Sequence, residues 1–225
     1  MEVMIPAEPG PVKVDINRTG LVVVDMQNAF CTRGGMFDSM GMLIESRVRP
    51  VIDTEKKLIG AARRRGIKII FLRMGYRPDL ADAGGPESPN YWKEGSLSAL
   101  REHPELKGKT LTVGSWDWEI IDELKPQPED IVVNKNRFSG FPHTGLDIIL
   151  RTNNLKHLLF TGLFTNVCVE STLRDAYFHE YFPILVKDCC GNMGPDYTQE
   201  ATIWTVAHVF GWVTTSADLI KAFDS

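Results

Sequence analysis

The sequence predicts an α/β protein of three layers, in which helices cover both faces of a doubly wound, mostly parallel six-stranded sheet. Short apolar segments alternate with segments of helical periodicity, which is the order of consecutive strand–helix units. The first apolar run, residues 19–25, is continuous, as expected for a parallel strand buried on both faces. The chain shows no internal repeat or linker, so we expect one domain over residues 1–225.

The strands are predicted from short runs rich in Val, Ile, Leu and Phe. They comprise residues 19–25, 68–73, 130–135, 157–163, 182–188 and 212–214. The first helical segment ends in three arginines before Gly66, as a helix C-terminus often does. Helices are expected at residues 42–65, 97–101, 118–124, 145–152, 169–180, 198–210 and 217–223. Residues 74–113 are too long for a plain connection, so we expect a lid or a pocket wall there.

The composition excludes several classes of protein. With 225 residues, of which 43% are hydrophobic and 24% charged, the chain resembles an ordinary globular domain. Its net charge of −4, without a clustered basic patch, argues against nucleic acid as a partner. No segment approaches the roughly 20 apolar residues that span a bilayer, and residues 1–11 do not resemble a signal peptide. The four cysteines fit neither a disulfide framework nor a zinc site, so we expect a cytoplasmic protein without a membrane partner.

Three reactive side chains lie where predicted strands end. Asp25 ends the first strand, Lys135 ends the third, and Cys168 lies where the fourth strand leads into a helix. Because ligands in open α/β sheets bind at the carboxyl ends of the strands, we expect these residues to meet in one site. Pairing between Asp25 and Lys135 would reduce the cost of burying their charges.

The chemistry of these three residue types predicts covalent catalysis. The N-terminus of a helix favours an anion, so we expect the pKa of Cys168 to be lowered and its thiolate to act as nucleophile. Asp25 could take the thiol proton, and Lys135 could orient Asp25 and stabilise the anions. No histidine lies at a matching position, which argues against a Cys/His pair. From spacing alone the structural alternatives stay open: an inert core cysteine, a capping aspartate and a solvated lysine.

Three separated motifs resemble the isochorismatase-like cysteine hydrolases. They are Val23-Val24-Asp25-Met26-Gln27-Asn28, then Asn134-Lys135, then Thr161-Gly162-Leu163-Phe164-Thr165-Asn166-Val167-Cys168-Val169. The motifs occur in the order of the family, and the resemblance spans nearly the whole chain, which implies the Rossmann-like sheet of that family. The resemblance implies a catalytic triad of Asp25, Lys135 and Cys168. It also implies a cis peptide between Leu163 and Phe164, and an oxyanion hole made by the N–H groups of Phe164 and Cys168.

The substrate class also follows from the resemblance. Family members with this cysteine hydrolyse C–N bonds of small amides and ureides through an S-acyl or S-carbamoyl enzyme. Residues 84–91 and 166–175 are similar to the branch that hydrolyses ureidoacrylate in pyrimidine degradation. Residues 75–82 and 188–191 are more similar to biuret hydrolases, and Asn136 replaces the proline that usually follows the lysine. Hydrolysis of biuret, triuret or an N-carbamoyl amino acid therefore stays open, as does an inactive binding protein.

The resemblance also bears on cofactors and partners. Metal-dependent relatives hold their ion with histidines after the second strand, but residues 73–91 contain none. We therefore expect no catalytic metal and no other cofactor, and a small ureide or amide as the partner molecule. The resemblance further implies a homo-oligomer, either dimer or tetramer, in which residues 198–210 could form a contact.

The pocket walls are predicted from polar and aromatic side chains near the strand ends. The candidates for substrate binding are Asn28, Phe30, Arg73, Arg77, Tyr91, Trp92, Phe138 and Asn166. The amides could hydrogen-bond a urea-type group, the arginines could clamp a carboxylate, and the aromatics could close a small, flat pocket. The alternatives are a loop cap for Asn28, surface positions for the arginines and core positions for the aromatics.

Overall fold

Six parallel strands form the central sheet of the computed structural model, which describes residues 1–43 and 45–224. Their bounds are β3 Thr19–Val24, β4 Lys68–Met74, β5 Ile131–Lys135, β6 His157–Leu163, β7 Phe182–Gly191 and β8 Trp212–Thr214. They lie in the order β5-β4-β3-β6-β7-β8, and each neighbouring pair is parallel. The predicted doubly wound α/β sheet is confirmed. The strand order reverses between β3 and β6, and ligands bind at such a switch point in open sheets.

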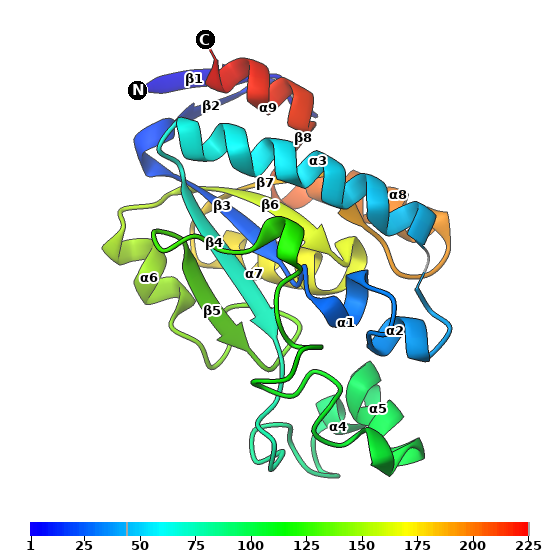
Figure 1. Cartoon of the computed structure of the whole chain (residues 1–225). Coiled ribbons are helices and arrows are strands. Elements are labelled where there is room, and N and C mark those ends of the chain that lie inside the picture. Colours follow the sequence, from blue (N-terminus) through cyan, green and yellow to red (C-terminus); the bar gives the residue numbers. More distant parts are fainter. Residues whose placement is uncertain (44, 225) are drawn as a thin grey trace.

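Helices cover both faces of this sheet (Figure 1). On one face lie α3 (Glu45–Arg64) and α9 (Ser216–Phe223), beside the hairpin of β1 (Glu2–Ile5) and β2 (Val12–Asp15). The other face carries α6 (Leu146–Thr152), α7 (Glu170–Phe178) and α8 (Asp196–Thr205), which continues as the π-helical turn Val206–Phe210. The three predicted layers are therefore present.

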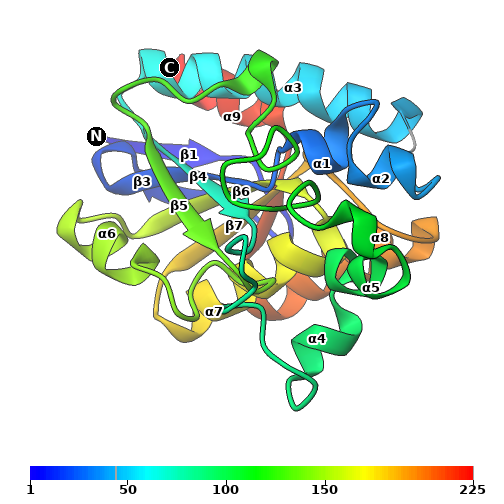
Figure 2. The ribbon, with the colours of Figure 1, turned by 60° about the horizontal axis from the view of Figure 1, so that its bottom comes forward.

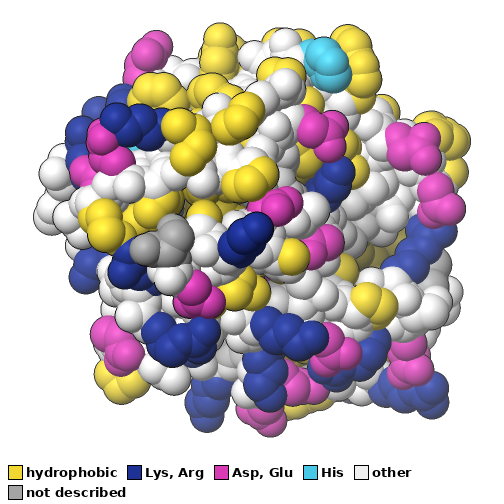
Figure 3. Space-filling model, turned by 90° about the horizontal axis from the view of Figure 1, so that it is seen from above, with side chains coloured by type: hydrophobic (Ala, Val, Ile, Leu, Met, Phe, Trp, Pro, Cys, Tyr) yellow, Lys and Arg dark blue, Asp and Glu magenta, His cyan; other side chains and the backbone are white. Residues whose placement is uncertain are grey.

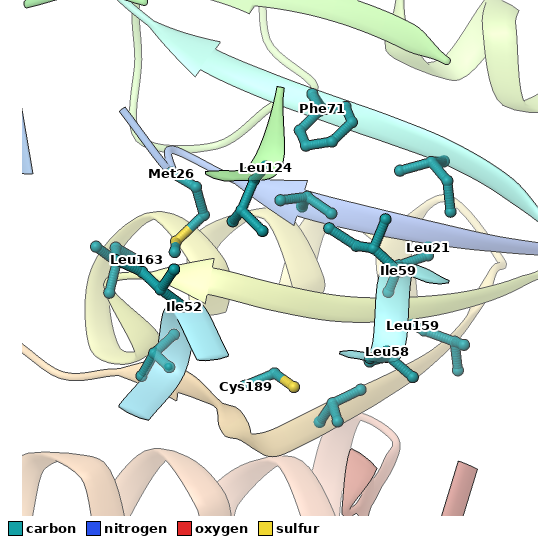
Figure 4. Close-up of a cluster of buried hydrophobic side chains, with 14 of the residues drawn as sticks. Leu21, Met26, Ile52, Leu58, Ile59, Phe71, Leu124, Leu159, Leu163 and Cys189 are labelled. Atoms are coloured by element: carbon teal, nitrogen blue, oxygen red, sulfur yellow. The ribbon is translucent and has the colours of Figure 1, made fainter. Parts of the chain in front are cut away.

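Alternate side chains of each inner strand enter two separate hydrophobic cores. In β3, Leu21 and Val23 belong to the core under α3, whereas Val22 and Val24 belong to the core under α6 and α7. All four are fully buried, because helices cover both faces, and this explains the continuous apolar run. Figure 4 shows the first core, where side chains of α3 meet those of β3, β4 and β6.

Two predicted helices differ from the structure. The helix α3 begins at Glu45 rather than at residue 42, and residue 44 lies outside the described residues. The helix predicted at residues 118–124 is wrong, since only Asp122–Leu124 forms a 3₁₀ turn. Gln27 pairs with Ile120 in an isolated β-bridge, and its side chain donates to the Trp118 carbonyl. Tertiary hydrogen bonds therefore replace helical ones in this segment.

Several short elements were not anticipated by the pattern of the sequence. They are the β1–β2 hairpin, α1 (Asn28–Cys31), α2 (Met36–Ser39) and α4 (Pro89–Lys93). The hairpin strands do alternate between buried and exposed residues, but each is only four residues long. The three helices have four or five residues each, and periodicity needs a longer window to be detected.

Short helices cover the carboxyl ends of the strands. The helices α1 and α2 follow β3, whereas α4 and α5 (Gly95–Glu102) belong to the long segment after β4. Figures 1 and 2 show these four helices at the end of the molecule toward which β4 and β5 point. The segment predicted as a lid or pocket wall thus contributes two helices at the edge of the sheet where ligands bind.

Gly162 allows β6 to approach β3 closely at the switch point. Its φ is +105°, a conformation that residues with a Cβ rarely adopt. A Cβ at this position would lie 2.1 Å from the backbone oxygen of Val24, far inside van der Waals contact. Because Val24 directly precedes Asp25, the glycine permits the packing that positions the end of the first strand of the sheet.

One carboxyl group lies in the core under α3 without a cation beside it. Glu55 is fully buried; Oε1 accepts a hydrogen bond from Thr161 Oγ1, and Oε2 has no partner among the described residues. Burial raises the pKa of Glu55 to about 8, and the hydrogen bond from Thr161 offsets only part of this shift. Glu55 therefore keeps its proton at neutral pH in the folded protein.

Relative to the wild type, a Glu55→Gln protein is expected to gain stability, on the order of 3 kcal/mol, as the pH rises from about 5 to about 8. The ordinary pKa of glutamate is 4.5, so between that pH and about 8 unfolding releases a proton, and the wild type loses stability as the pH rises. Glutamine fills the same volume and has no proton to release. Urea denaturation at about pH 5, 7 and 8 should show a difference that grows with pH.

The matched control is Glu200→Gln, at an exposed position of α8. This change should leave the free energy of unfolding within about 0.5 kcal/mol of the wild type at each pH. An effect of Glu55→Gln that is the same at all three pH values would contradict the proposed protonation of Glu55.

Candidate active site

The end of β3 places a carboxylate in the interior. Asp25 follows β3 directly and is 1% exposed. Its φ is +52°, a left-handed conformation that aspartate adopts more readily than most residues. Its N–H donates to the Leu72 carbonyl of β4 at 3.0 Å. The chain therefore turns at Asp25, and the carboxylate stays at the edge of the sheet.

The end of β5 supplies the opposite charge. Lys135 closes this strand, and its Nζ lies 2.6 Å from Asp25 Oδ2. Nζ also donates to the Arg137 carbonyl at 3.3 Å and lies 3.7 Å from Met74 Sδ. Both charged side chains are almost completely buried, so the ion pair forms in surroundings of low dielectric constant.

The thiol lies next to this ion pair. Cys168 belongs to the π-helical turn Thr165–Val169, which joins β6 to α7, and it is 6% exposed. Its carbonyl accepts a hydrogen bond from Thr172 Oγ1 at 2.7 Å. Cys168 lines the same cavity as Asp25, and its thiol acts on the pKa values of both Asp25 and Lys135. The structure thus brings together the three reactive side chains that the strand ends pointed to.

Burial acts on the pKa values of all three groups, and it decides the direction of the shift for Asp25 and Cys168 but not for Lys135. It raises the pKa of Asp25, and the attraction of Lys135 offsets only part of that shift. It lowers the pKa of Lys135, but the attractions of Asp25 and Cys168 outweigh it, so that pKa is raised. Burial also raises the pKa of Cys168 well above its ordinary value, despite the nearby Lys135. The expectation of a lowered thiol pKa is therefore wrong, because desolvation outweighs the nearby cation.

This arrangement suits activation of the thiol by a general base. Lys135 holds Oδ2 of Asp25, whereas Oδ1 is buried with no hydrogen-bond partner in the described part of the chain. Oδ1 is therefore the oxygen that is free to receive a proton. A raised carboxylate pKa makes Asp25 a stronger base, so the thiol can lose its proton as it reacts rather than beforehand.

A small cavity lies over Asp25 and Cys168. It has a volume of about 170 Å³, below the range for drug-sized ligands, which suits a small molecule. Four aromatic side chains form part of its wall: Phe30, Phe37, Phe138 and Phe164. The Phe37 ring stacks on that of Phe164 with centroids 5.0 Å apart, and Phe30 meets both edge-on. The cis peptide implied by the resemblance is present between Leu163 and Phe164.

Two of the eight predicted substrate-binding residues, Phe30 and Phe138, line this cavity. The two arginines do not. Arg73 stacks on the Trp118 ring at 3.3 Å and pairs with Glu119 at 2.8 Å. Arg77 is exposed and pairs with Asp79. Their guanidinium groups are occupied within the protein, so we do not assign them to the pocket.

Neither amide enters the cavity wall. Asn28 donates to the Trp116 carbonyl at 2.9 Å and so holds a loop, which agrees with its structural alternative. Asn166 forms two hydrogen bonds with the backbone of Met193, at 2.9 and 3.0 Å. Because Met193 lines the cavity, Asn166 contributes by holding a wall residue in place.

The predicted aromatics of α4 also lie outside the cavity wall. Tyr91 and Trp92 contact each other edge-on, and the Arg101 guanidinium lies over both rings. Trp92 Nε1 donates to the Pro86 carbonyl at 2.8 Å. These contacts order α4, and the residues that follow Trp92 in the chain, Lys93 and Glu94, reach the cavity instead.

Most of the residues that line the cavity were not predicted from the sequence. Five methionines line the cavity: Met36, Met40, Met42, Met74 and Met193. Three of them lie within residues 36–42, a local concentration that could have marked this segment as a binding wall. Nothing in the spacing of Met193 or Lys93 indicated a site, because only the fold brings their segments to Cys168.

Two further features of the described residues concern ligands and membranes. No group of three or more His, Cys, Asp or Glu side chains is arranged to hold a metal ion. No helix combines the length and the apolar character needed to cross a membrane.

The fold and the site define an α/β protein with a buried carboxylate–ammonium pair beside a cysteine at the switch point of the sheet. The family model described as the Isochorismatase domain matches residues 19–218. The chain belongs to the isochorismatase family, which confirms the resemblance of the three motifs.

Named relatives and solved structures agree with this assignment. The ureidoacrylate amidohydrolase RutB of Caulobacter segnis is 45% identical over 221 residues, covering 98% of this chain and 92% of that protein. The protein of the same name from Rhizobium rhizogenes is 46% identical over 216 residues, covering 96% and 87%. The crystal structure of a cysteine hydrolase from Pseudomonas syringae pv. phaseolicola is 30% identical with a TM-score of 0.79, covering 97% of each chain. The N-carbamoylsarcosine amidase of Thermoplasma acidophilum is 26% identical with a TM-score of 0.66, covering 88% and 96%.

Proposed function

We propose that this chain hydrolyses a C–N bond of a small ureide of the ureidoacrylate type, by covalent catalysis through Cys168. The observation that carries the proposal is the buried ion pair of Asp25 and Lys135, 2.6 Å apart, beside the thiol in a small cavity. Relatives 45% and 46% identical are named ureidoacrylate amidohydrolases, which supports the substrate class.

In the first half-reaction, Asp25 takes the thiol proton while the sulfur of Cys168 attacks the ureido carbonyl carbon. The N–H groups of Phe164 and Cys168 stabilise the oxyanion. Phe164 lines the cavity, and its carbonyl accepts from the N–H groups of Val167 and Val169 at 2.9 and 3.2 Å, which orders this turn. Asp25 then returns its proton to the leaving nitrogen. The C–N bond breaks, the amine departs, and an S-carbamoyl enzyme remains.

In the second half-reaction, Asp25 deprotonates a water molecule that attacks the S-carbamoyl carbon. The C–S bond breaks, carbamate leaves, and the thiol regains its proton. Lys135 stays charged throughout and holds Oδ2 of Asp25, which leaves Oδ1 to take up and return the proton in both steps.

Two measurements test this function: the turnover of a panel of substrates, and the detection of a covalent adduct on the enzyme. We expect release of carbamate-derived ammonia from ureidoacrylate, and a mass increase of one carbamoyl group on Cys168 after acid quenching. Turnover without any adduct on Cys168, under conditions where deacylation limits the rate, would contradict the covalent route.

The second candidate is hydrolysis of an N-carbamoyl amino acid, which the structural likeness to N-carbamoylsarcosine amidase favours. Biuret and triuret belong in the same panel because of the segments similar to biuret hydrolases. Turnover of one of these compounds at a higher kcat/KM than ureidoacrylate would replace the first choice of substrate while leaving the chemistry of Cys168 unchanged.

We also propose that the chain works as a homo-oligomer in the cytoplasm. The four cysteines are free, which agrees with a reducing compartment. A second hollow of about 530 Å³ is lined by Tyr177, Phe178 and Phe210, and Phe178 is 67% exposed. Exposed apolar patches often mark contacts between proteins. Figure 3 shows that hydrophobic side chains also gather in the upper left of the view, with several charged side chains among them. Sedimentation of the purified protein measures its oligomeric state and so tests this proposal.

A further inference from the structure

The cavity over Cys168 has few polar side chains. Besides Asp25 and Cys168, which react, the polar side chains among its lining residues are Lys93 and Glu94. The two residues are neighbours in the chain and lie at the junction of α4 and α5. Any polar group of a substrate that lies beyond the reacting carbonyl must therefore be recognised mainly by this pair or by backbone groups.

The two side chains differ in whether their charged groups already have partners within the protein. Glu94 is 4% exposed, and its Oε2 accepts hydrogen bonds from Leu97 N–H at 3.0 Å and from Ser96 Oγ. This carboxylate caps the N-terminus of α5, so it already has partners. Lys93 is exposed and forms no ion pair or hydrogen bond with the described residues, Glu94 included. Its ammonium group therefore remains available to a ligand.

The junction also holds Lys93 in a defined place. Lys93 is the last residue of α4, and the cap that Glu94 provides begins α5 directly afterwards. The Arg101 guanidinium of α5 lies over the Tyr91 and Trp92 rings of α4, which ties the two helices together. An ammonium group on an ordered element at the mouth of an apolar cavity is a suitable anchor for an anion.

The position of Lys93 separates it from the reaction itself. Lys93 lines the cavity from the end of α4, whereas Cys168 lines it from the turn Thr165–Val169 at the end of β6. A group held by Lys93 would therefore lie away from the sulfur. A ureidoacrylate molecule has this form, with a ureido group at one end and a carboxylate at the other, whereas biuret has no carboxylate.

We propose that Lys93 is a specificity-determining residue that binds the carboxylate of the substrate and so selects anionic ureides over uncharged ones. The inference rests on the proposed hydrolysis of ureides at Cys168, and it goes further by naming the residue that reads the other end of the substrate.

The test compares a carboxylated substrate with an uncharged one. For Lys93→Gln, the ratio of kcat/KM for ureidoacrylate to kcat/KM for its methyl ester should fall about 10- to 100-fold, mainly through KM. Lys93→Arg should restore most of this ratio, because it restores the cation. The matched control is Lys68→Gln, at the exposed first residue of β4 on the opposite edge of the sheet, which should leave the ratio unchanged.

Binding measurements separate this proposal from the proposed reaction. In a Cys168→Ala background, calorimetry should show that ureidoacrylate binds about 10- to 100-fold more weakly once Lys93→Gln is added. Binding that depends on Lys93 without any turnover in the wild type would uphold the anchor and overturn the reaction. An unchanged ratio and unchanged binding in Lys93→Gln would overturn the anchor, whether or not ureidoacrylate is turned over. Failure of any carboxylated ureide to bind the Cys168→Ala protein would also overturn it.

Discussion

Replacing Cys168 by alanine is expected to lower kcat by at least about 10³-fold while the protein stays folded. The sulfur forms the covalent bond in the proposed route, and no other lining residue of the cavity carries a thiol or hydroxyl group that could replace it. The side chain is 6% exposed at the wall of an existing cavity, so its loss should cost little stability. Steady-state kinetics and thermal unfolding of the same preparation measure both effects.

Cys189→Ala is the matched control. Cys189 is completely buried in the core under α3, which Figure 4 shows, and it does not line the cavity. Its loss should lower stability by about 1 kcal/mol or more and leave kcat per folded molecule near the wild-type value. A Cys168→Ala protein that retains turnover would end the case for covalent catalysis.

The raised pKa of Cys168 changes how the thiol should be tested. In the substrate-free protein the thiol is protonated, so it should react slowly with an alkylating reagent at neutral pH. Slow labelling therefore does not distinguish an enzyme from an inactive binding protein. The adduct formed with substrate does, because Asp25 removes the proton only when the sulfur attacks.

Replacing Lys135 by methionine is expected to abolish turnover and to destabilise the protein by about 3–5 kcal/mol at neutral pH. Methionine fills much of the same space, but it leaves the Asp25 carboxylate without its partner in an interior where both side chains are almost fully buried. Removing Lys135 also removes the attraction that lowers the pKa of Asp25, so this pKa rises further. An acid whose folded pKa lies above its unfolded pKa loses stability as pH rises, so the defect should be larger at about pH 8 than at about pH 5.

A double-mutant cycle tests the origin of this loss. Adding Asp25→Asn to Lys135→Met removes the uncompensated charge, so most of the stability should return although activity does not. The surface pair Arg151–Asp147 is the comparison, and Arg151→Met should change the free energy of unfolding far less than Lys135→Met does. If Lys135→Met were as mild as Arg151→Met and equally independent of pH, the ion pair would not have the role assigned to it.

The strands and the reactive residues could be predicted because their signals are local. A continuous apolar run such as residues 19–25 is required wherever helices cover both faces of a sheet, and β3 has this environment. Asp25 and Lys135 stood out because each ends such a run, where a charged side chain needs a specific partner. The family was predictable for the same reason, since its motifs are short and contiguous.

The pocket was not predictable in this way. Its wall combines residues 36–42, 93–95 and Met193, which come from three separate segments with no shared pattern. The predicted Arg73 and Arg77 found partners within the protein, on Glu119 and Asp79, and no spacing rule shows in advance which charges will be paired. The helix expected at residues 118–124 is absent for a similar reason, because Gln27 forms hydrogen bonds with this segment from a distant part of the chain.

The sequence by itself therefore determined the doubly wound sheet, the family and the identity of the acid, the amine and the thiol, since these depend on patterns within a few consecutive residues. The tertiary structure alone decided the protonation of the thiol, the apolar wall of methionines and phenylalanines, and the free ammonium group of Lys93. These properties depend on desolvation and on which partners lie nearby, and both are set by segments that are distant in the chain.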